Sequence, residues 1–195
     1  VIDFLIEGGL DGILVLGSAG EFPDLNEQER LDFFRFYAEY VNGRVELLAG
    51  TGCIRYADTL ALSNAVYELG YTPMVISPYY FEMDQEKLFV YYDRLAKDVK
   101  GDLYLYNFPP RTGHSIAPET IRRLIDVNPN IIGLKDSVST PGHTNMVCRA
   151  VDGKPFTVYS GFDDQFLSNI ANNGGGGCIG ALSIIVPEIW SSLVK

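Results

Sequence analysis

Short apolar runs alternate with helix-like segments along almost the entire chain. Seven of these runs have the length and the β-branched content of buried strands, and a segment with helical periodicity follows each of them. The strands are expected at residues 12–16, 45–49, 74–77, 103–106, 130–135, 157–160 and 178–182. The repeat is about 30 residues long at first and about 20 later, which is typical of βα units. Because a helix between two strands returns the chain to the same edge, the strands must pair in parallel.

The helices are predicted from their periodicity and from the signals at their ends. They are expected at residues 1–7, 26–42, 56–69, 84–99, 118–126, 144–151 and 163–173, with a last helix that Pro187 opens. Asn26 and Glu29 have the spacing of a capping box at the start of the second helix. The four glycines at 174–177 are interpreted as a helix stop and a tight loop, with a phosphate-binding turn as the alternative.

Two architectures contain such a repeat, a closed (β/α)8 barrel and an open doubly wound sheet. The barrel is favoured because no G-x-G-x-x-G follows any of the strand runs. The chain begins within a helical pattern, so we expect a first strand before Val1, and without it the sheet would have two open edges. We therefore predict an α/β fold, a (β/α)8 TIM barrel without its first strand, as a single domain over residues 1–195 that is incomplete at both ends.

Composition and charge narrow the classes of function. The formal net charge of −10 argues against nucleic acid or an anionic membrane as the main partner, because both require a basic face. Small acidic substrates remain possible where a local positive site overrides this charge. Three widely spaced cysteines, Cys53, Cys148 and Cys178, are expected to be reduced thiols of a cytoplasmic protein. Neither a long apolar stretch nor a signal sequence is found, so a membrane span and secretion are not predicted.

The run that ends at Lys135 places an amine at the carboxyl end of a strand buried on both faces. Burial should lower the pKa of this lysine and leave more of it as a free nucleophile. Schiff-base chemistry has that requirement. The alternative is a lysine that extends to solvent or pairs with the neighbouring Asp136.

In a barrel, the residues that follow the strands gather at one end, where active sites lie. Ser18 lies in a glycine-rich turn after one strand, and its backbone N–H groups are free to bind an anion. The other polar side chains that follow strands are Tyr79, Tyr80, Tyr106, Arg111, Asp163 and Asp164, with Gly161 beside the acids. With Lys135 they provide an amine, a proton shuttle and a carboxylate clamp, which imine chemistry on a keto acid needs.

Three segments carry a resemblance to a known family. Gly17-Ser18-Ala19-Gly20-Glu21, Tyr106-Asn107-Phe108-Pro109-Pro110-Arg111-Thr112-Gly113 and Gly133-Leu134-Lys135-Asp136 resemble the signatures of the dihydrodipicolinate synthase and N-acetylneuraminate lyase family. These are pyruvate-dependent class I aldolases on a TIM barrel. The resemblance is collinear over nearly the whole chain. Family members also have a strand before Val1 and a helical region after the barrel, and we expect both to lie outside residues 1–195.

The resemblance implies roles for individual residues. Lys135 resembles the lysine that forms the imine with pyruvate, and Tyr106 the phenol that relays protons to it. Ser18 stands where the family has a relay hydroxyl. Tyr80 matches a tyrosine that family members insert into the site of a neighbouring subunit, which implies a homo-oligomer, either a dimer or a tetramer. Tyr106 as a core aromatic and the Tyr79-Tyr80 pair as an interface anchor remain as alternatives.

The keto acid itself is assigned to the turn at Ser18. The backbone N–H groups of Ser18 and Ala19 would bind the pyruvate carboxylate, with Ile179 close by. Ala19 departs from the family, in which many members have a second hydroxyl at that position. The missing hydrogen bond should weaken carboxylate binding by roughly 1 kcal/mol.

Two features disagree about the second substrate. Arg111 resembles the arginine with which dihydrodipicolinate synthases hold the carboxylate of the aldehyde, although it could also pair with a loop carboxylate. Asp163 and Asp164 resemble the acids with which N-acetylneuraminate lyases and 2-keto-3-deoxy sugar-acid aldolases bind hydroxyls, or they are capping residues of a helix. Arg111 is given slightly more weight, which favours a 4-hydroxy-tetrahydrodipicolinate synthase that condenses pyruvate with aspartate semialdehyde.

No cofactor is expected, because the imine provides the electron sink that a metal or flavin would otherwise supply. His114 and His143 have no partners at metal-ligand spacing and are predicted to be solvated loop residues. The expected partners are small molecules, pyruvate and an aldehyde. From a different class of function, a non-catalytic barrel that keeps the pocket without the chemistry remains open.

Overall fold

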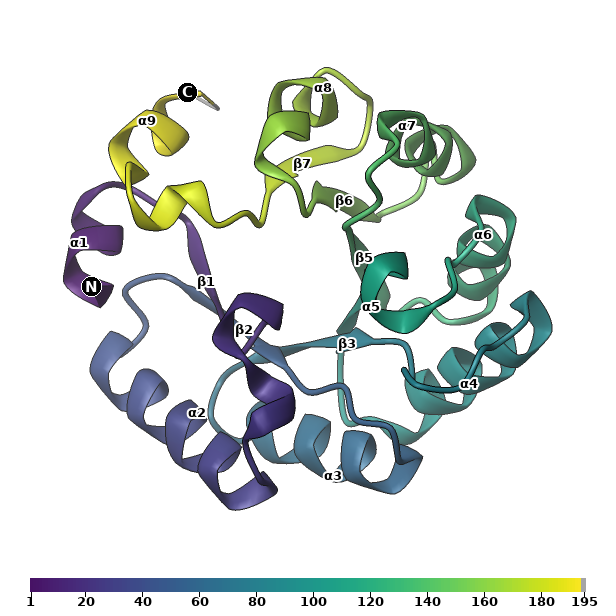
Figure 1. Cartoon of the computed structure of the whole chain (residues 1–195), viewed down its shortest axis with the longest axis horizontal. Helices are drawn as coiled ribbons and strands as arrows, with labels where there is room; N and C mark the ends of the chain where they lie inside the picture. The colour runs from purple at the N-terminus through teal and green to yellow at the C-terminus, as the bar shows by residue number, and fades with distance from the viewer. Residues whose placement is uncertain (194–195) are drawn as a thin grey trace.

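The strands form one curled parallel sheet in a computed structural model that describes residues 1–193 (Figure 1). Within those residues the sheet has seven strands, and each pairs with the next one along the chain. The strands are β1 (Gly12–Val15), β2 (Glu46–Gly50), β3 (Thr72–Ile76), β4 (Leu103–Asn107), β5 (Ile131–Asp136), β6 (Thr157–Ser160) and β7 (Gly175–Cys178). The parallel α/β architecture predicted from the sequence is confirmed.

The helices lie around the curled sheet, most of them on its outer face (Figure 1). They are α1 (Ile2–Glu7), α2 (Glu27–Val41), α3 (Tyr56–Tyr67), α4 (Gln85–Asp98), α5 (Pro109–Thr112), α6 (Pro118–Val127), α7 (Pro141–Ala150), α8 (Phe166–Ile170) and α9 (Pro187–Ser192). Short 3-10 turns lie at Ser18–Gly20, Phe22–Asp24, Asp163–Gln165 and Leu182–Ile184. The predicted capping box is present at α2, where the Asn26 side chain accepts from the Glu29 N–H and the Glu29 carboxylate accepts from the Asn26 N–H.

Alternate residues of β4 face opposite sides of the sheet, as strand geometry requires. Leu103 and Leu105 belong to the core between the sheet and helices α4, α6 and α7. Tyr104 and Tyr106 belong to a second core, which includes residues of β1, β2 and β3. A residue at the end of a strand can therefore be assigned to the interior of the curled sheet or to the helix side by whether it lies an even or an odd number of positions from a strand residue of known orientation.

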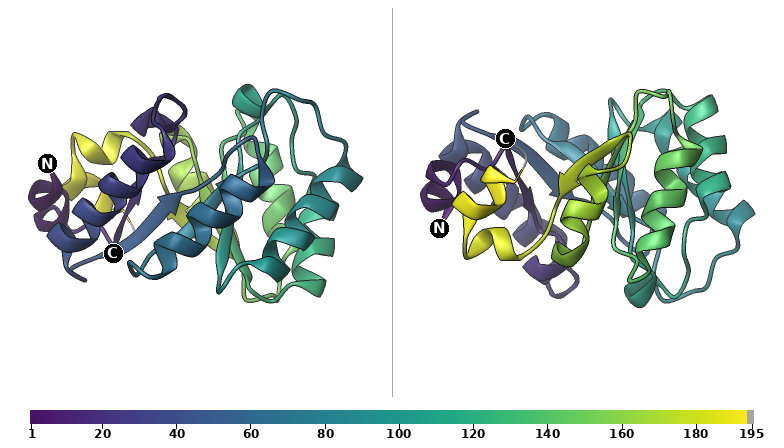
Figure 2. Two further views of the ribbon diagram at one scale, coloured as in Figure 1. Left: turned by 90° about the horizontal axis from the view of Figure 1, so that it is seen from below. Right: turned by 90° about the horizontal axis from the view of Figure 1, so that it is seen from above.

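The sheet remains open between β1 and β7. In the described part of the chain neither strand has a neighbour on its outer side. Helices α1 and α9 lie next to each other at this opening (Figure 2), and the Ser191 hydroxyl donates to the Gly8 carbonyl at 2.8 Å. A cavity of about 520 Å³ extends inward from here along β1 and β7. The two open edges predicted from the sequence are confirmed.

Strand β7 differs from the sequence prediction. It spans Gly175–Cys178 rather than 178–182, so three of the four glycines assigned to a helix stop and loop lie within a strand. A Cβ on Gly175 would collide with the Asn169 carbonyl, and a Cβ on Gly176 would collide with the Thr157 side chain. Glycine is required here by close approach to neighbouring atoms, which overrides its poor strand propensity.

None of the helices among residues 1–193 has the length and apolar character needed to cross a membrane.

Candidate active site

Lys135 lies at the carboxyl end of β5 and is almost completely buried, with 8% of its surface exposed. It is the register partner of Tyr106 on β4, and its Nζ lies over the Tyr106 ring, 4.7 Å from the ring centroid. Asp136 is bound to His143 on the opposite face of the strand. The alternative of a lysine in solvent or paired with Asp136 is therefore wrong.

The environment of Lys135 favours its neutral form. Burial lowers the pKa of the amine to about 8, and the nearby Cys178 and Asp163 oppose this shift through their negative charge when ionised. With a pKa of about 8, roughly a tenth of the amine is unprotonated at pH 7, whereas an exposed lysine would be almost fully charged.

Tyr106 presents its phenol beside Lys135. The Tyr106 hydroxyl and Ser18 Oγ are 3.2 Å apart and share a hydrogen bond. Burial raises the pKa of the phenol, and hydrogen bonding to Ser18 and Ser137 partly offsets this effect. The phenol is therefore protonated at neutral pH and can donate.

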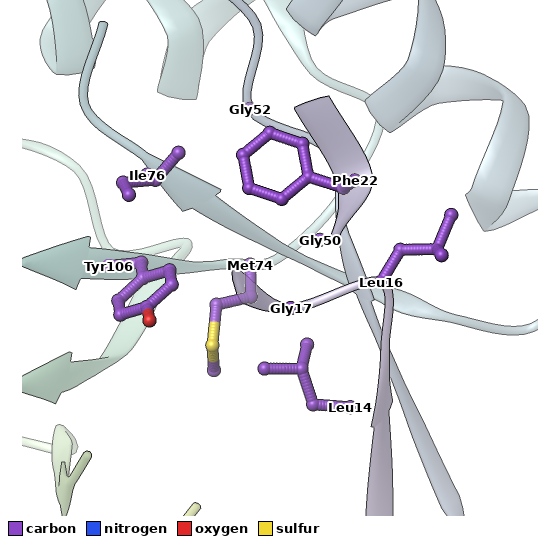
Figure 3. A pocket seen from close by; sticks show the side chains of 9 residues that line it. All are labelled: Leu14, Leu16, Gly17, Phe22, Gly50, Gly52, Met74, Ile76 and Tyr106. Carbon is purple, nitrogen blue, oxygen red and sulfur yellow. The ribbon is translucent and has the colours of Figure 1, made fainter. Parts of the chain in front are cut away.

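The position of the Tyr106 ring is fixed by apolar packing. Figure 3 shows the ring beside Met74, Ile76 and Leu14 around a cavity of about 10 Å³. This volume is no larger than a single water requires, and the lining offers few polar partners. The packing holds the ring rigidly while its hydroxyl reaches Ser18.

The turn after β1 and the segment after β7 complete the interior of the site. Ser18, Ala19 and Ile179 line the 520 Å³ cavity together with Lys135. Ser18 and Ala19 belong to a 3-10 turn that follows β1, and the Ile179 N–H donates to the Ser160 carbonyl. The structure thus brings the turn expected to bind the keto-acid carboxylate to the same cavity as the amine.

Gly161 follows β6 and lies against the amine. A Cβ at this position would be 3.1 Å from Lys135 Cε and 2.9 Å from Ser137 Cβ, and it would collide with Ser137 Oγ. The absence of a side chain therefore makes room for Lys135.

Three predicted site residues are exposed and are not among the residues that line the 520 Å³ cavity. Arg111 is exposed on α5, with its guanidinium 5.9 Å from the centroid of the Phe108 ring, and none of the ion pairs within residues 1–193 involves it. The alternative in which Arg111 pairs with a loop carboxylate is therefore wrong. Asp164 is exposed as well. Tyr80 is 83% exposed, packs edge-on against Phe81 and has a φ of +83°, a strained value for a tyrosine.

Asp163 is already engaged by the backbone. Its carboxylate oxygens accept hydrogen bonds from the Ala181 N–H at 3.2 Å and the Leu182 N–H at 3.1 Å. Asp163 therefore holds the turn that follows Ile179, and it does not cap the 3-10 helix in which it lies.

Sequence reasoning missed Ser137 and misread both histidines. Ser137 lies two residues after Lys135, so strand parity alone could have placed it on the same face. The prediction of solvated loop histidines is wrong. His114 is buried and shares a hydrogen bond with Ser77, and His143 lies within α7 and contacts Asp136. No group of three or more His, Cys, Asp or Glu that could hold a metal occurs among residues 1–193.

The fold and the site define a class of protein: a curled parallel βα sheet with a buried lysine, a phenol and a hydroxyl at the carboxyl ends of its strands. The model of the Dihydrodipicolinate synthetase family matches residues 1–195. The chain belongs to this family.

Its relatives are named for two different activities. The putative 2-dehydro-3-deoxy-D-gluconate aldolase YagE of Escherichia coli is 37% identical, covering 100% of this chain and 65% of the relative. A 4-hydroxy-tetrahydrodipicolinate synthase of Kosmotoga olearia is 35% identical, covering 96% of this chain and 64% of the relative. The crystal structure of YagE in complex with pyruvate superimposes with a TM-score of 0.95 at 36% identity, covering 100% of this chain and 66% of that structure. The chain thus spans slightly less than two thirds of the length of these proteins.

Proposed function

We propose that this protein is a lyase in which Lys135 forms a Schiff base with pyruvate. The observation that carries the proposal is the buried Lys135 amine, whose pKa is lowered to about 8, beside the Tyr106–Ser18 hydrogen bond. Family membership supports it, and one relative is described in complex with pyruvate.

In the proposed reaction, the neutral Nζ of Lys135 attacks C2 of pyruvate. The backbone N–H groups of the turn at Ser18 and Ala19 bind the carboxylate. Tyr106 donates a proton to the departing hydroxyl, which leaves as water and gives the imine, and Ser18 passes protons to and from the phenol. Loss of a proton from C3 to the relay of Tyr106 and Ser18 gives an enamine, which adds to the carbonyl carbon of an aldehyde while the relay returns the proton to the aldehyde oxygen. Hydrolysis of the new imine releases the product and restores the amine.

For the second substrate we propose an aldehyde that carries a carboxylate, as aspartate semialdehyde does. Arg111 is the supporting observation, since its exposed guanidinium has no carboxylate partner within residues 1–193 and can bind one in two-pronged fashion. The binding of Asp163 to the Ala181 and Leu182 N–H groups argues in the same direction, because it leaves this acid fewer free lone pairs for sugar hydroxyls.

The second candidate is cleavage of a 2-keto-3-deoxy sugar acid to pyruvate and a hydroxyaldehyde. Two relatives from Escherichia coli are named as aldolases of this kind, at 37% and 36% identity. The aldehyde released carries hydroxyls instead of a carboxylate, so this reaction has no need of Arg111. Asp164, which is exposed, would remain available to those hydroxyls.

The test combines trapping and turnover. Borohydride with pyruvate should attach one reduced pyruvate to Lys135, located by peptide mass spectrometry, and Lys135→Ala should abolish labelling. Arg111→Ala should keep the adduct but raise KM for aspartate semialdehyde by at least about 10-fold, as expected for loss of a charged hydrogen bond. Release of pyruvate from a sugar acid, unaffected by Arg111→Ala, would instead establish the second candidate. Failure of pyruvate to label Lys135 would exclude both reactions and favour a non-catalytic barrel.

We further propose that the working form is a homo-oligomer. Tyr80 is strained and 83% exposed, which suits a side chain that contacts a second subunit. In this arrangement the phenol of Tyr80 would enter the site of that subunit and extend the relay of Tyr106 and Ser18.

A further inference from the structure

The ends of β4 and β5 carry a second pair of residues behind the site. Asn107 and Asp136 directly follow Tyr106 and Lys135, and they are register partners. Both are fully buried, and Asn107 Nδ2 donates to Asp136 Oδ1 at 2.8 Å. Because successive residues of a strand face opposite sides, this pair lies on the helix side of the strands, away from the amine and the phenol.

Helix α7 contacts the other oxygen of Asp136. Thr144 Oγ1 donates to Asp136 Oδ2 at 2.7 Å, and His143 Nδ1 lies 2.9 Å from the same oxygen. On the far side of the imidazole, His143 Nε2 lies 3.2 Å from the carbonyl oxygen of Ile116. The imidazole thus lies between a carboxylate oxygen and a carbonyl oxygen.

These partners determine the protonation of His143. A carbonyl oxygen can only accept, and the Asp136 carboxylate accepts as well, so both hydrogen bonds are made only when both ring nitrogens carry protons. The ionisable groups around the imidazole favour the protonated, positively charged form of His143. Burial lowers the pKa of His143, but the hydrogen bond and charge of Asp136, the Ile116 carbonyl and the charge of Glu119 on α6 raise it above its usual value. Cys148 on α7 also lies near Asp136, and its own thiol pKa is raised to about 11, so it is uncharged at neutral pH.

The contacts close into a ring. The Ile116 N–H donates to Asn107 Oδ1 at 3.0 Å, so Asn107, Asp136, His143 and Ile116 are linked in a cycle. The cycle joins the ends of β4 and β5 to helix α7 and to the segment between α5 and α6. Loss of the His143 proton would remove one of the two imidazole hydrogen bonds and leave the buried Asp136 without a compensating charge.

We propose that His143 is a positioning residue, which as an imidazolium holds Asp136 and thereby fixes the strand ends that present Lys135 and Tyr106. The effect on imine formation rests on the proposed function. The effect on the strand ends does not, and the two are measured separately.

The first experiment follows protonation without any substrate. The chain has two histidines, so the ring signals of His143 in NMR spectra can be assigned by comparison with a His143→Gln variant. We expect His143 to remain doubly protonated at pH values above the usual 6.5, and Asp136→Asn to lower its pKa below that of the parent. The backbone amide signals of Tyr106 and Lys135 should shift with the same midpoint. The proposal would be overturned if His143 is neutral at pH 6.5, or if the amide signals of Tyr106 and Lys135 do not change as His143 titrates. Both outcomes can be measured even if pyruvate is not a substrate.

The second experiment measures the rate of pyruvate trapping by borohydride as a function of pH. In the parent protein the rate should depend on two protonations: it should increase as Lys135 loses its proton, and it should decrease across the midpoint found for His143 by NMR. In His143→Gln the fall should disappear, and the rate below that midpoint should be about 10-fold lower, as expected for a displaced nucleophile.

Thr144→Val is the matched control, because it removes a neutral donor to the same Asp136 oxygen and keeps the imidazolium. In Thr144→Val the decrease in trapping rate with pH should remain, with the same midpoint as in the parent protein. If His143→Gln keeps that decrease, or if both variants change the profile alike, the imidazolium has no role beyond packing and the proposal is wrong. Should His143→Gln fail to fold, the agreement of the two midpoints in the parent protein decides the question.

Discussion

Lys135 is an amine with very little surface exposed to solvent. Its ordinary pKa of 10.5 is lowered to about 8 because burial disfavours the ammonium. At neutral pH the folded chain must therefore accommodate a poorly solvated charge or release a proton. The burial that makes this amine nucleophilic also destabilises the fold, a conflict that is common at functional sites.

This conflict predicts a stability gain in an inactive variant. Lys135→Met, which keeps much of the volume without the charge, should raise the free energy of unfolding near pH 7 by about 3 kcal/mol. Between about pH 8 and 10.5 the unfolded parent chain binds more protons than the folded one, so the parent becomes more stable as pH rises through this interval. The advantage of the variant should therefore shrink across it. Denaturant unfolding of both proteins at several pH values measures this, and a variant less stable than the parent near pH 7 would contradict it.

Gly161 allows a second prediction at the residue scale. In Gly161→Ala the new Cβ would collide with Ser137 Oγ and lie 3.1 Å from Lys135 Cε. We expect pyruvate trapping to slow by about 10-fold or more, because the amine is displaced. Gly142→Ala is the matched control, since the nearest atom to its new Cβ would be 4.0 Å away. Equal trapping rates in the two variants would show that Gly161 does not constrain the amine.

At the scale of elements, one carboxylate connects the turns after β6 and β7. Asp163 accepts from the Ala181 and Leu182 N–H groups and so holds the turn after Ile179. We expect Asp163→Ala to raise KM for pyruvate by about 10-fold, because hydrogen bonds to a charged group are lost and the wall of the cavity moves. Asp164→Ala should leave this KM unchanged. If Asp164→Ala instead weakens the binding of a sugar acid, the acids act on substrate as in the second candidate function.

Strand ends could be predicted well from the sequence where side chains obey strand propensity. The runs before Tyr106 and Lys135 are rich in branched and aromatic residues, and β4 and β5 end within one residue of the prediction. Strand β7 could not be placed in this way. Gly175 and Gly176 are required because atoms of Asn169 and Thr157 lie too close for a side chain, and this closeness becomes visible only in the folded sheet.

The histidine network was missed because a helix boundary was misplaced. The predicted helix began at residue 144, whereas α7 begins at residue 141, so His143 was assigned to a loop. A proline at the first helical position is a recognised start signal and could have corrected the boundary. The partner Asp136 lies on a different element, and only the packing of α7 on the sheet brings the two together.

At the scale of the whole molecule, the proposed relay has two of its three members in contact. Ser18 and Tyr106 share a hydrogen bond, whereas Tyr80 is 83% exposed and is not among the residues that line the cavity. If a second subunit supplies the phenol, Tyr80→Phe and Lys135→Ala should each be inactive alone. Mixed under conditions of subunit exchange, they should recover activity in sites that combine an intact Lys135 with an intact Tyr80 from its neighbour. Recovery is measured as turnover against the mixing ratio, and none at any ratio would show that Tyr80 does not act across subunits.

The order of the strands also divides the site into two halves of unequal stiffness. Lys135 and Tyr106 follow β5 and β4, which lie in the middle of the sheet with a neighbour on each side. Ser18 and Ala19 follow β1, which within residues 1–193 is paired on one side only. Lys135 is thus carried by backbone that should exchange its amide hydrogens slowly, and the turn at Ser18 and Ala19 by backbone that should open readily. Keto-acid binding would then tighten the turn far more than the lysine, so that the ligand completes the anchoring of the edge strand to which it binds.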